Sequence, residues 1–400
     1  MGTLISRMMA MAAGLCLAGL AHAQTNAELR IAHVYSQSGP LEAYGKQTAV
    51  GFRMGLEFAT AGTMTVAGRK IVVIEKDDQG KPDVGRALLA AAYSEDKADV
   101  AVGPTSSGVA LAMLPVAAEH RKLLLVEPAV ADAITGEKGN RYIFRTARNS
   151  SQDAIANALA VDKPGTHIAT LAQDSAFGRG GTDAFKQAAR PGAVVHQEFV
   201  PAAATAADIT AATAHIVAAL KGHSGRKVVW VLWAGAGIPL KAIEADLKRN
   251  GIELTTPGNT LAGMNAFNSL PGMEGGATYY FGFSRSTPNQ WLVANHYLRH
   301  GGPPDLFTAG GMTAAIALVE AFKRTGGSAD TERLIATMEG MSFDTPKGRM
   351  SFRKEDHQAM QAMYHFRVSQ GARAGTIPDL KLVREIPATA IAVPLYVKSQ

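Results

Sequence analysis

Short apolar runs alternate with amphipathic segments along most of the chain, and this alternation predicts strands followed by helices. The first apolar run, at 29–35, indicates a strand. A polar loop at 36–45 separates it from a segment in which Ala49, Phe52 and Leu56 recur on one helical face. Repeated strand–loop–helix units of this kind are typical of a parallel sheet that helices cover on both faces.

The same unit recurs through the first third of the chain. The predicted strands lie at 70–74, 98–102 and 123–126, and the predicted helices at 86–93 and 109–117. The strand at 98–102 runs into a Gly-Pro-Thr-Ser-Ser-Gly loop at 103–108. Loops that join a strand's carboxyl end to a helix's amino end bind ligands in open α/β sheets, because backbone N–H groups line the crevice.

A second series follows an extended segment at 141–146. Its predicted strands lie at 168–171, 227–233, 277–283, 348–352 and 364–368. Four helices are predicted in this series. One passes through Phe185 and one begins after Asp208. A third has Leu240, Ile243 and Leu247 on its inner face, and a fourth has Met312, Ala315, Ile316 and Val319 on one face. Two similar α/β halves joined by extended crossovers predict two Rossmann-like lobes that close on a ligand between them.

Composition supports a globular protein of two domains. The chain has 400 residues, of which 47% are hydrophobic and 18% charged. The formal net charge is +6 and the pI about 9.3, with basic and acidic residues interspersed. Dispersed charge without a basic block argues against nucleic-acid binding and favours anionic solutes only weakly.

Residues 1–23 are predicted to form a secretory signal peptide. Arg7 supplies its basic region, 8–20 its apolar region, and Ala-His-Ala at 21–23 its cleavage site. The one cysteine, Cys16, lies inside this segment, and the preceding Leu15 is not the small residue that a lipoprotein site needs. We expect no later run long and charge-free enough to span a membrane. The mature protein should be soluble in a bacterial periplasm and held together by its core without disulfides.

Enzyme motifs are incomplete in this sequence. It has no Gly-x-x-x-x-Gly-Lys-Ser/Thr phosphate loop, no His-Glu-x-x-His and no Gly-x-Ser-x-Gly. The glycines Gly178, Gly180 and Gly181 do not complete a dinucleotide fingerprint. We therefore expect a binding protein rather than an enzyme, with no metal and no cofactor.

The Ser-rich loop supplies the first candidate ligand contacts. Ser106 and Ser107 either cap the helix that follows or donate hydroxyl and backbone N–H hydrogen bonds to a carboxylate, and the two interpretations are compatible. Arg145 and Arg148, in the crossover segment, could pair with a ligand carboxylate, although a structural ion pair is the preferred interpretation.

Aromatic residues supply candidate walls. Tyr44 and Phe177 each lie next to or near a glycine in a strand–helix loop, one in each half of the chain. Such a side chain is either a surface aromatic or a rigid pocket wall with an apolar face. Trp233, at the end of a predicted strand, is a better pocket candidate than Trp230, which we expect in the core.

The ordered set of motifs resembles one family. The matching stretches are Ser38-Gly39-Pro40 with Tyr44-Gly45 and Gly51; 70–78; Val102-Gly103-Pro104 with Ser106-Ser107; Arg145-Thr146; Asp174 with Phe177-Gly178; Gly272-Met273-Glu274-Gly275; and Phe343-Asp344-Thr345-Pro346-Lys347-Gly348. Together they resemble the type I periplasmic solute-binding proteins of the branched-chain amino acid (leucine/isoleucine/valine) receptor group of ABC transporters.

The resemblance implies an α/β fold of two Rossmann-like lobes, joined by a three-crossover hinge, with the ligand clamped between them. The implied N-terminal lobe is 24–145 plus 277–350, the C-terminal lobe 146–276 plus 351–390, and the tail 391–400. The implied carboxylate site comprises Ser106, Ser107 and the loop Ala129, Val130 and Ala131. The implied aromatic walls are Tyr44 and Phe177.

The chain departs from the family pattern at two places. Val130 and Ala131 lack the hydroxyl that usually reaches the ligand carboxylate. The second-lobe loop at 257–268 has no acid to hold an α-ammonium group, and an unpaired buried ammonium is costly. Asp174 is a candidate replacement or a structural residue. The missing acid favours a carboxylate without an ammonium group, such as an aromatic acid.

We therefore expect a periplasmic receptor that delivers a small carboxylate-bearing solute to ABC permease subunits in the inner membrane. Its ligand is a branched-chain or other apolar amino acid, or alternatively an aromatic or other organic acid. A second alternative is a ligand-sensing module for a membrane partner. We expect a monomer, and an exported α/β enzyme is disfavoured because no nucleophile–base motif is present.

Overall fold

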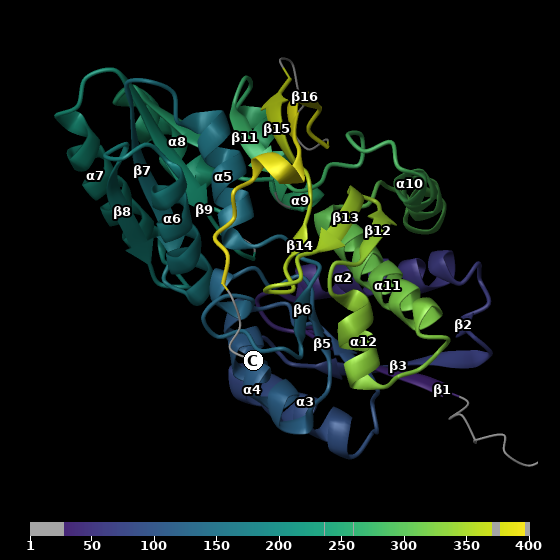
Figure 1. Cartoon of the computed structure of the whole chain (residues 1–400). Coiled ribbons are helices and arrows are strands. Elements are labelled where there is room, and N and C mark those ends of the chain that lie inside the picture. Colours follow the sequence, from purple (N-terminus) through teal and green to yellow (C-terminus); the bar gives the residue numbers. More distant parts are fainter. Residues whose placement is uncertain (1–27, 236, 259, 370–376, 397–400) are drawn as a thin grey trace, which may run out of the picture.

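The computed structural model describes residues 28–235, 237–258, 260–369 and 377–396, and it confirms the predicted α/β class (Figure 1). The predicted signal peptide, with Cys16, lies outside the described residues, as does the end of the predicted tail at 397–400.

The first sheet is six-stranded, in the order β2-β3-β1-β4-β5-β6. Its strands are β1 (Glu28–Tyr35), β2 (Thr65–Val66), β3 (Arg69–Asp77), β4 (Val100–Val102), β5 (Leu124–Val126) and β6 (Ile143–Arg145). The helices between them are α2 (Glu42–Ala59), α3 (Pro82–Ser94) and α4 (Ser107–His120). Because β1 pairs in parallel with β4, and β4 with β5, the loops that follow these three strands meet at one edge of the sheet.

The second sheet is four-stranded and parallel, in the order β10-β9-β7-β8. Its strands are β7 (Thr166–Gln173), β8 (Val194–Val200), β9 (Arg226–Leu232) and β10 (Ile252–Thr255), and its helices α5 (Ser150–Val161), α6 (Ala176–Ala188), α7 (Ala206–Lys221) and α8 (Leu240–Arg249). The sequence pattern missed α5 because nearly all of its residues are buried, so no polar face marks its helical period. It missed β8 because this edge strand is only half-buried.

The last third of the chain contributes to both halves. Its elements are α9 (Leu261–Met264), β11 (Glu274–Ala277), α10 (Thr287–His300), α11 (Leu306–Arg324), α12 (Thr331–Met338), β12 (Ser342–Thr345), β13 (Gly348–Phe352), β14 (Ala359–Met360), β15 (Met363–Val368) and β16 (Leu380–Ile386), with short 3-10 turns at Asp132–Ile134, Asn265–Ser269 and Ala388–Ala390. The predicted strand at 277–283 is wrong beyond Ala277. The apolar run reflects buried side chains rather than a strand, since Tyr279 and Tyr280 are both buried. Their hydroxyls donate hydrogen bonds to Asn289 Oδ1 and to the carbonyl oxygen of Pro378.

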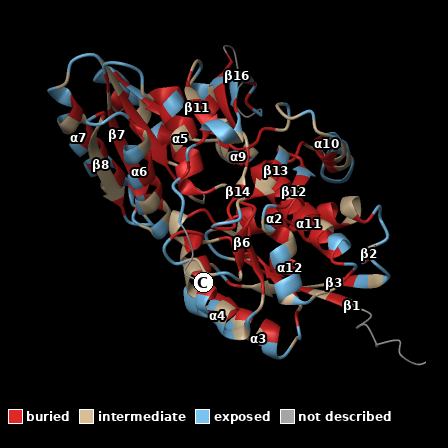
Figure 2. Ribbon diagram, viewed as in Figure 1, coloured by how far each residue is buried: buried red, intermediate tan, exposed pale blue. Residues whose placement is uncertain are grey.

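Each half has its own hydrophobic core, visible as buried sheets under partly exposed helices (Figure 2). The first core joins Leu29, Leu125 and Met312, and it also includes Phe352 and Ala359. A second core, in the other half, contains side chains between Ala169 and Tyr280, together with Phe366, Val368 and Leu380. The chain passes between the halves after β6, after β11 and after β14, which produces two lobes with three connections.

Helix α11 corrects one expectation from the sequence. By length and composition it could cross a membrane, contrary to the prediction that no later run would do so. In the structure 89% of the apolar 18-residue stretch of this helix is buried, and the helix packs along α2 in the first core. Its apolar composition is therefore the composition of a central core helix.

The contact between α2 and α11 depends on glycines. A Cβ atom added at Gly51 would lie 1.8 Å from the carbonyl oxygen of Thr308, and one added at Gly311 would lie 2.0 Å from that of Thr48. Backbone atoms cannot move aside as a side chain can, so these two positions exclude any larger residue.

We predict that Gly51→Ala lowers the free energy of unfolding by about 1–3 kcal/mol, because the methyl group forces α2 and α11 apart. The matched control is Gly180→Ala in α6, where no atom lies within 4 Å of the added Cβ. The control should be neutral or stabilising by up to ~1 kcal/mol, since alanine favours a helix interior. Urea denaturation of both variants measures the difference, and equal effects would refute the close-packing argument.

Glu274, in the resemblance motif, is a structural residue of the second lobe. Its carboxylate accepts hydrogen bonds from Lys163 at 3.2 Å, His365 at 2.9 Å and Arg367 at 2.9 Å. Burial alone would raise its pKa, but these three partners outweigh burial and lower the pKa from 4.5 to about 2. The ionised carboxylate therefore stabilises the fold.

We predict a pH-dependent cost for Glu274→Gln. A carboxyl group whose pKa is lower in the folded state stabilises that state above its unfolded pKa, and the contribution is lost as pH falls. The variant should be less stable than the parent near neutral pH, and the difference should shrink as pH falls from 4.5 to about 2. Denaturation curves across that range test this, and a pH-independent difference would contradict it.

Candidate functional site

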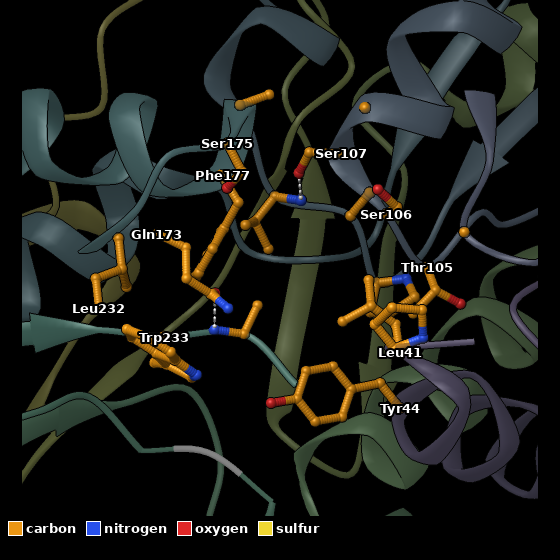
Figure 3. A pocket seen from close by; sticks show the side chains of 18 of the residues that line it. Leu41, Tyr44, Thr105, Ser106, Ser107, Gln173, Ser175, Phe177, Leu232 and Trp233 are labelled. Carbon is orange, nitrogen blue, oxygen red and sulfur yellow. Dashed lines mark hydrogen bonds between the residues drawn. The ribbon is translucent and has the colours of Figure 1, made fainter. Parts of the chain in front are cut away.

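A cavity of about 370 Å³ lies between the two lobes (Figure 3). Loops after β1, β4 and β5 line it on one side, and segments after β7, β8 and β9 line it on the other. The volume is near the lower end of the ~300–1,000 Å³ typical of small-molecule sites. The cavity therefore lies where carboxyl ends of parallel strands from both sheets face one another.

The structure brings seven of the nine predicted site residues to this cavity. They are Tyr44, Ser106, Ser107, Ala129, Val130, Phe177 and Trp233. Figure 3 shows the serines of the first lobe facing Gln173, Phe177 and Trp233 of the second. Trp230 is buried and stacks on Phe185, as expected for a core residue.

Two predicted residues are not among those that line the cavity. The backbone of Ala131 is engaged within the protein, since its N–H donates to Ser107 Oγ at 3.1 Å and its carbonyl accepts from Arg145 at 2.6 Å. The carboxylate of Asp174 is half-exposed and accepts two hydrogen bonds from Arg179, at 2.6 and 2.8 Å, which lower its pKa. Asp174 therefore does not replace the missing ammonium-binding acid.

The amino end of α4 faces the cavity without a side-chain cap. Ser106 occupies the N-cap position in extended conformation, but its hydroxyl makes no capping hydrogen bond. Helix α6 differs, because its N-cap residue Ser175 accepts from the N–H of Gly178 at 3.0 Å. The capping interpretation of Ser106 is therefore wrong. The first turn of α4 offers N–H groups and the positive end of a helix to whatever occupies the cavity.

Ser107 connects α4 to the next loop. Its Oγ accepts hydrogen bonds from the N–H groups of Val130 at 3.2 Å and Ala131 at 3.1 Å. Both acceptor positions are therefore used, and no described residue accepts the hydroxyl hydrogen. The hydroxyl that the family pattern expects on the loop after β5 is absent, and Ser107 holds that loop by its backbone instead.

Tyr44 links the lobes as well as lining the cavity. Its Oη accepts a hydrogen bond from the N–H of Gly235 at 2.8 Å, and it lies 3.3 Å from the carbonyl oxygen of the same residue. Its ring stacks on Phe307 with centroids 4.2 Å apart. Because Gly235 follows β9 in the other lobe, this contact depends on how far the lobes are closed.

The sequence reasoning missed Gln173 and Leu232 as lining residues. Gln173 Oε1 accepts from the N–H of Ala234 at 2.9 Å, and its Nε2 donates to Ala202 at 3.3 Å, so it fixes two cavity loops. Both residues are the last of their strands. The rule that ligands bind at the carboxyl ends of parallel strands could have identified them.

The two arginines of the crossover have different environments. Arg145 is fully buried and donates to Gln358, Ala131 and Thr135, and burial lowers its pKa to about 10. Arg148 lines the cavity and donates from Nε to Asp153 Oδ2 at 2.9 Å. The structural ion pair that we preferred for these arginines is therefore found at Arg148, whereas Arg145 is bonded to uncharged groups.

Buried charges lie behind Arg148. Burial raises the pKa of Asp153, and the neighbouring guanidinium opposes this rise. Glu127 is buried, accepts from Thr146 Oγ1 at 2.9 Å, and has its pKa raised by burial. Burial lowers the pKa of Lys347 to about 8. These four groups form a charged cluster where the chain passes between the lobes.

Comparison with known protein families shows which family has this two-lobed architecture. A model of periplasmic binding proteins matches residues 28–373, which covers nearly all of the described chain. The chain belongs to the periplasmic binding protein family. This confirms the resemblance inferred from the motifs, together with the two-lobed fold.

Relatives of this periplasmic binding protein are found among bacterial receptors. The Leu/Ile/Val-binding protein BraC3 of Rhizobium johnstonii is 26% identical over 348 residues, covering 85% of this chain and 90% of the relative. The crystal structure of an ABC-type branched-chain amino acid transporter protein from Rhodopseudomonas palustris CGA009 is 55% identical, with a TM-score of 0.81, and covers 93% of this chain and 100% of its own.

A third relative has a ligand of another class. The solute-binding protein of an ABC transporter from Rhodopseudomonas palustris BisB5, in complex with 3,4-dihydroxybenzoic acid, is 25% identical with a TM-score of 0.78. The alignment covers 90% of this chain and 98% of that one. Some proteins similar to this chain are therefore named for amino acids, and another is in complex with an aromatic acid.

We predict that Tyr44→Phe weakens ligand binding about 5- to 150-fold, since it removes the two hydrogen bonds between Tyr44 and Gly235, which together contribute about 1–3 kcal/mol. The free protein should also be more open, which small-angle X-ray scattering measures as a larger radius of gyration. Tyr297→Phe, at an exposed position on α10, is the matched control. An unchanged scattering curve and affinity for Tyr44→Phe would contradict the interlobe role.

Proposed function

We propose that this protein is the solute-binding component of an ABC importer, and that it captures a small carboxylate with an apolar, ring-sized body and no ammonium group. The observation that carries the proposal is the uncapped amino end of α4, which faces an otherwise largely apolar cavity between the lobes. A carboxylate accepts hydrogen bonds from such N–H groups and is stabilised by the helix dipole.

The acidic groups that line the cavity favour a ligand without an ammonium group. Among the described residues that line it, Asp153 is the one acid, and its Oδ2 already accepts from Arg148. A buried ammonium group needs an anionic partner of its own. The aromatic and aliphatic walls, which include Tyr44, Phe177 and Trp233, suit a flat apolar body.

An apolar amino acid is the second candidate ligand. The 55% identical protein is described as a branched-chain amino acid transporter protein. Asp153 would then have to share its carboxylate between Arg148 and the ligand ammonium. The complex of the 25% identical relative with an aromatic acid favours the first candidate.

The transport role follows from the family. Members serve ABC transporters as receptors, so the partners are a small molecule and membrane permease subunits, and export to the periplasm is implied. We propose that the protein acts as a monomer, because both lobes of one chain contribute residues to the cavity, and that it binds without chemical change to the ligand.

We predict that benzoate and para-hydroxybenzoate raise the melting temperature of the mature protein in a concentration-dependent way, whereas leucine, isoleucine and valine do not. A ligand at 100 times its Kd stabilises the folded state by about 2.7 kcal/mol. The protein should first be unfolded and refolded to remove any copurified solute, which mass spectrometry then identifies.

Each other outcome has a defined meaning. Stabilisation by leucine alone would transfer the assignment to the second candidate. No shift with any carboxylate would end the proposed function. Chromatography of the bound compound after long incubation tests for turnover, and a new product would show that the protein is an enzyme.

A further inference from the structure

We propose that Arg148 is the specificity-determining residue of the site: with the amino end of α4, it clamps the ligand carboxylate, and Asp153 holds its guanidinium in position. This inference rests on the proposed function and deepens it, because it names the group that separates carboxylates from neutral analogues. It also assigns the two carboxylate contacts to different lobes.

The hydrogen bonds around Val130 bring Arg148 and α4 to the same end of the cavity. The N–H of Val130 donates to Ser107 Oγ, in the first turn of α4, at 3.2 Å. Its carbonyl oxygen accepts from the N–H and Oγ of Ser150, at 2.9 and 3.2 Å. Ser150 follows Arg148 by two residues, and both Val130 and Arg148 line the cavity. One residue therefore ties the start of α4 to the segment that carries the arginine.

The guanidinium of Arg148 is only partly used by the protein. Its Nε donates to Asp153 Oδ2 at 2.9 Å, whereas its two terminal nitrogens make no hydrogen bond to any residue that the structure describes. The side chain is 12% exposed. A guanidinium fixed through Nε presents its remaining N–H groups in a planar fork, which matches the geometry of a carboxylate.

Asp153 is the positioning residue. It lies in the first turn of α5 and is buried, and its second oxygen lies 3.4 Å from Thr278 Oγ1. Both carboxylate oxygens thus have protein partners. The ion pair takes one edge of the guanidinium and leaves the other for the ligand.

Arg145 shows by contrast what a purely structural arginine looks like in this segment. It has no exposed surface, and its Nε and both terminal nitrogens donate to protein oxygens at 2.6 Å. The two arginines are three residues apart. All three guanidinium nitrogens of Arg145 are bonded to protein oxygens, whereas within the described part of the chain Arg148 is bonded through Nε alone and lines the cavity. The difference points to a ligand for Arg148.

The clamp would couple recognition to lobe closure. The amino end of α4 belongs to the first lobe, and Arg148 leads into α5 of the second. A carboxylate held by both completes contacts on the two sides of the cavity at once, whereas a neutral amide cannot accept from the guanidinium through two equivalent oxygens.

The test compares a carboxylate with its neutral isostere. Isothermal titration with benzoate and benzamide should show that the unmodified protein prefers benzoate by at least about 30-fold. Arg148→Gln should lower benzoate affinity about 10- to 100-fold, as expected for hydrogen bonds to a charged group, and reduce the preference over benzamide to below about threefold. Arg148→Lys should be intermediate, because lysine keeps the charge without the fork.

The controls separate specific from structural effects. Arg179→Gln removes an exposed ion pair to Asp174 outside the cavity lining and should change neither affinity. Asp153→Asn should lower benzoate affinity less than Arg148→Gln and add little to it in the double variant, because it acts through the arginine. If Arg148→Gln does not fold, the benzoate-to-benzamide ratio of Arg148→Lys decides, since a structural role leaves that ratio unchanged.

Failure of this inference and failure of the proposed function give different results. Unmodified protein that binds leucine and not benzoate would end the aromatic-acid assignment, and leucine with leucinamide would then replace the benzoate pair. The Arg148 inference is overturned if Arg148→Gln weakens the acid and the amide equally, or if it leaves the affinity for the acid unchanged.

Discussion

The site depends on the hydroxyl oxygen of Ser107, which accepts two backbone N–H groups from the neighbouring loop. This contact fixes Val130 and Ala131 against the first turn of α4, at the edge where the parallel strands end. It satisfies the buried amides of a loop that has no polar side chain at these positions. The residues at the start of α4, Ser106, Ser107 and Gly108, line the cavity beside this contact.

The remaining architecture supplies a second surface and lets it move. Each lobe is held together by hydrophobic clusters of its own, and the chain passes between the lobes three times. Contacts that bridge the cavity include the hydrogen bonds between Tyr44 and Gly235. Contacts of this size are easily broken in water. Closure can therefore follow ligand binding, because a ligand that touches both lobes adds its own contacts to the closed state.

The polar ends of the cavity set the class of ligand more than its walls do. The walls offer aromatic and aliphatic surface that many small molecules would fit. The charged groups are far more restrictive, because Arg148 and Asp153 already face each other and each is partly desolvated. An additional cation would compete with Arg148 for Asp153, whereas an additional anion finds free donors on both α4 and Arg148.

The sequence by itself determined the repeated strand–loop–helix units, the two-lobed α/β class and the loops that form the cavity, because hydrophobic period and turn residues are local properties. It also identified Tyr44, Ser107 and Phe177 as candidates. Only the tertiary structure decided the roles of similar residues. Asp174 and Asp153 are both acids near a helix start, but one faces solvent and the other the cavity. Arg145 and Arg148 lie in one short segment, but every guanidinium nitrogen of the first is bonded to a buried protein oxygen, whereas the second lines the cavity and is bonded to a described residue through Nε alone. Such distinctions depend on which distant segments surround a side chain, and no local pattern encodes them.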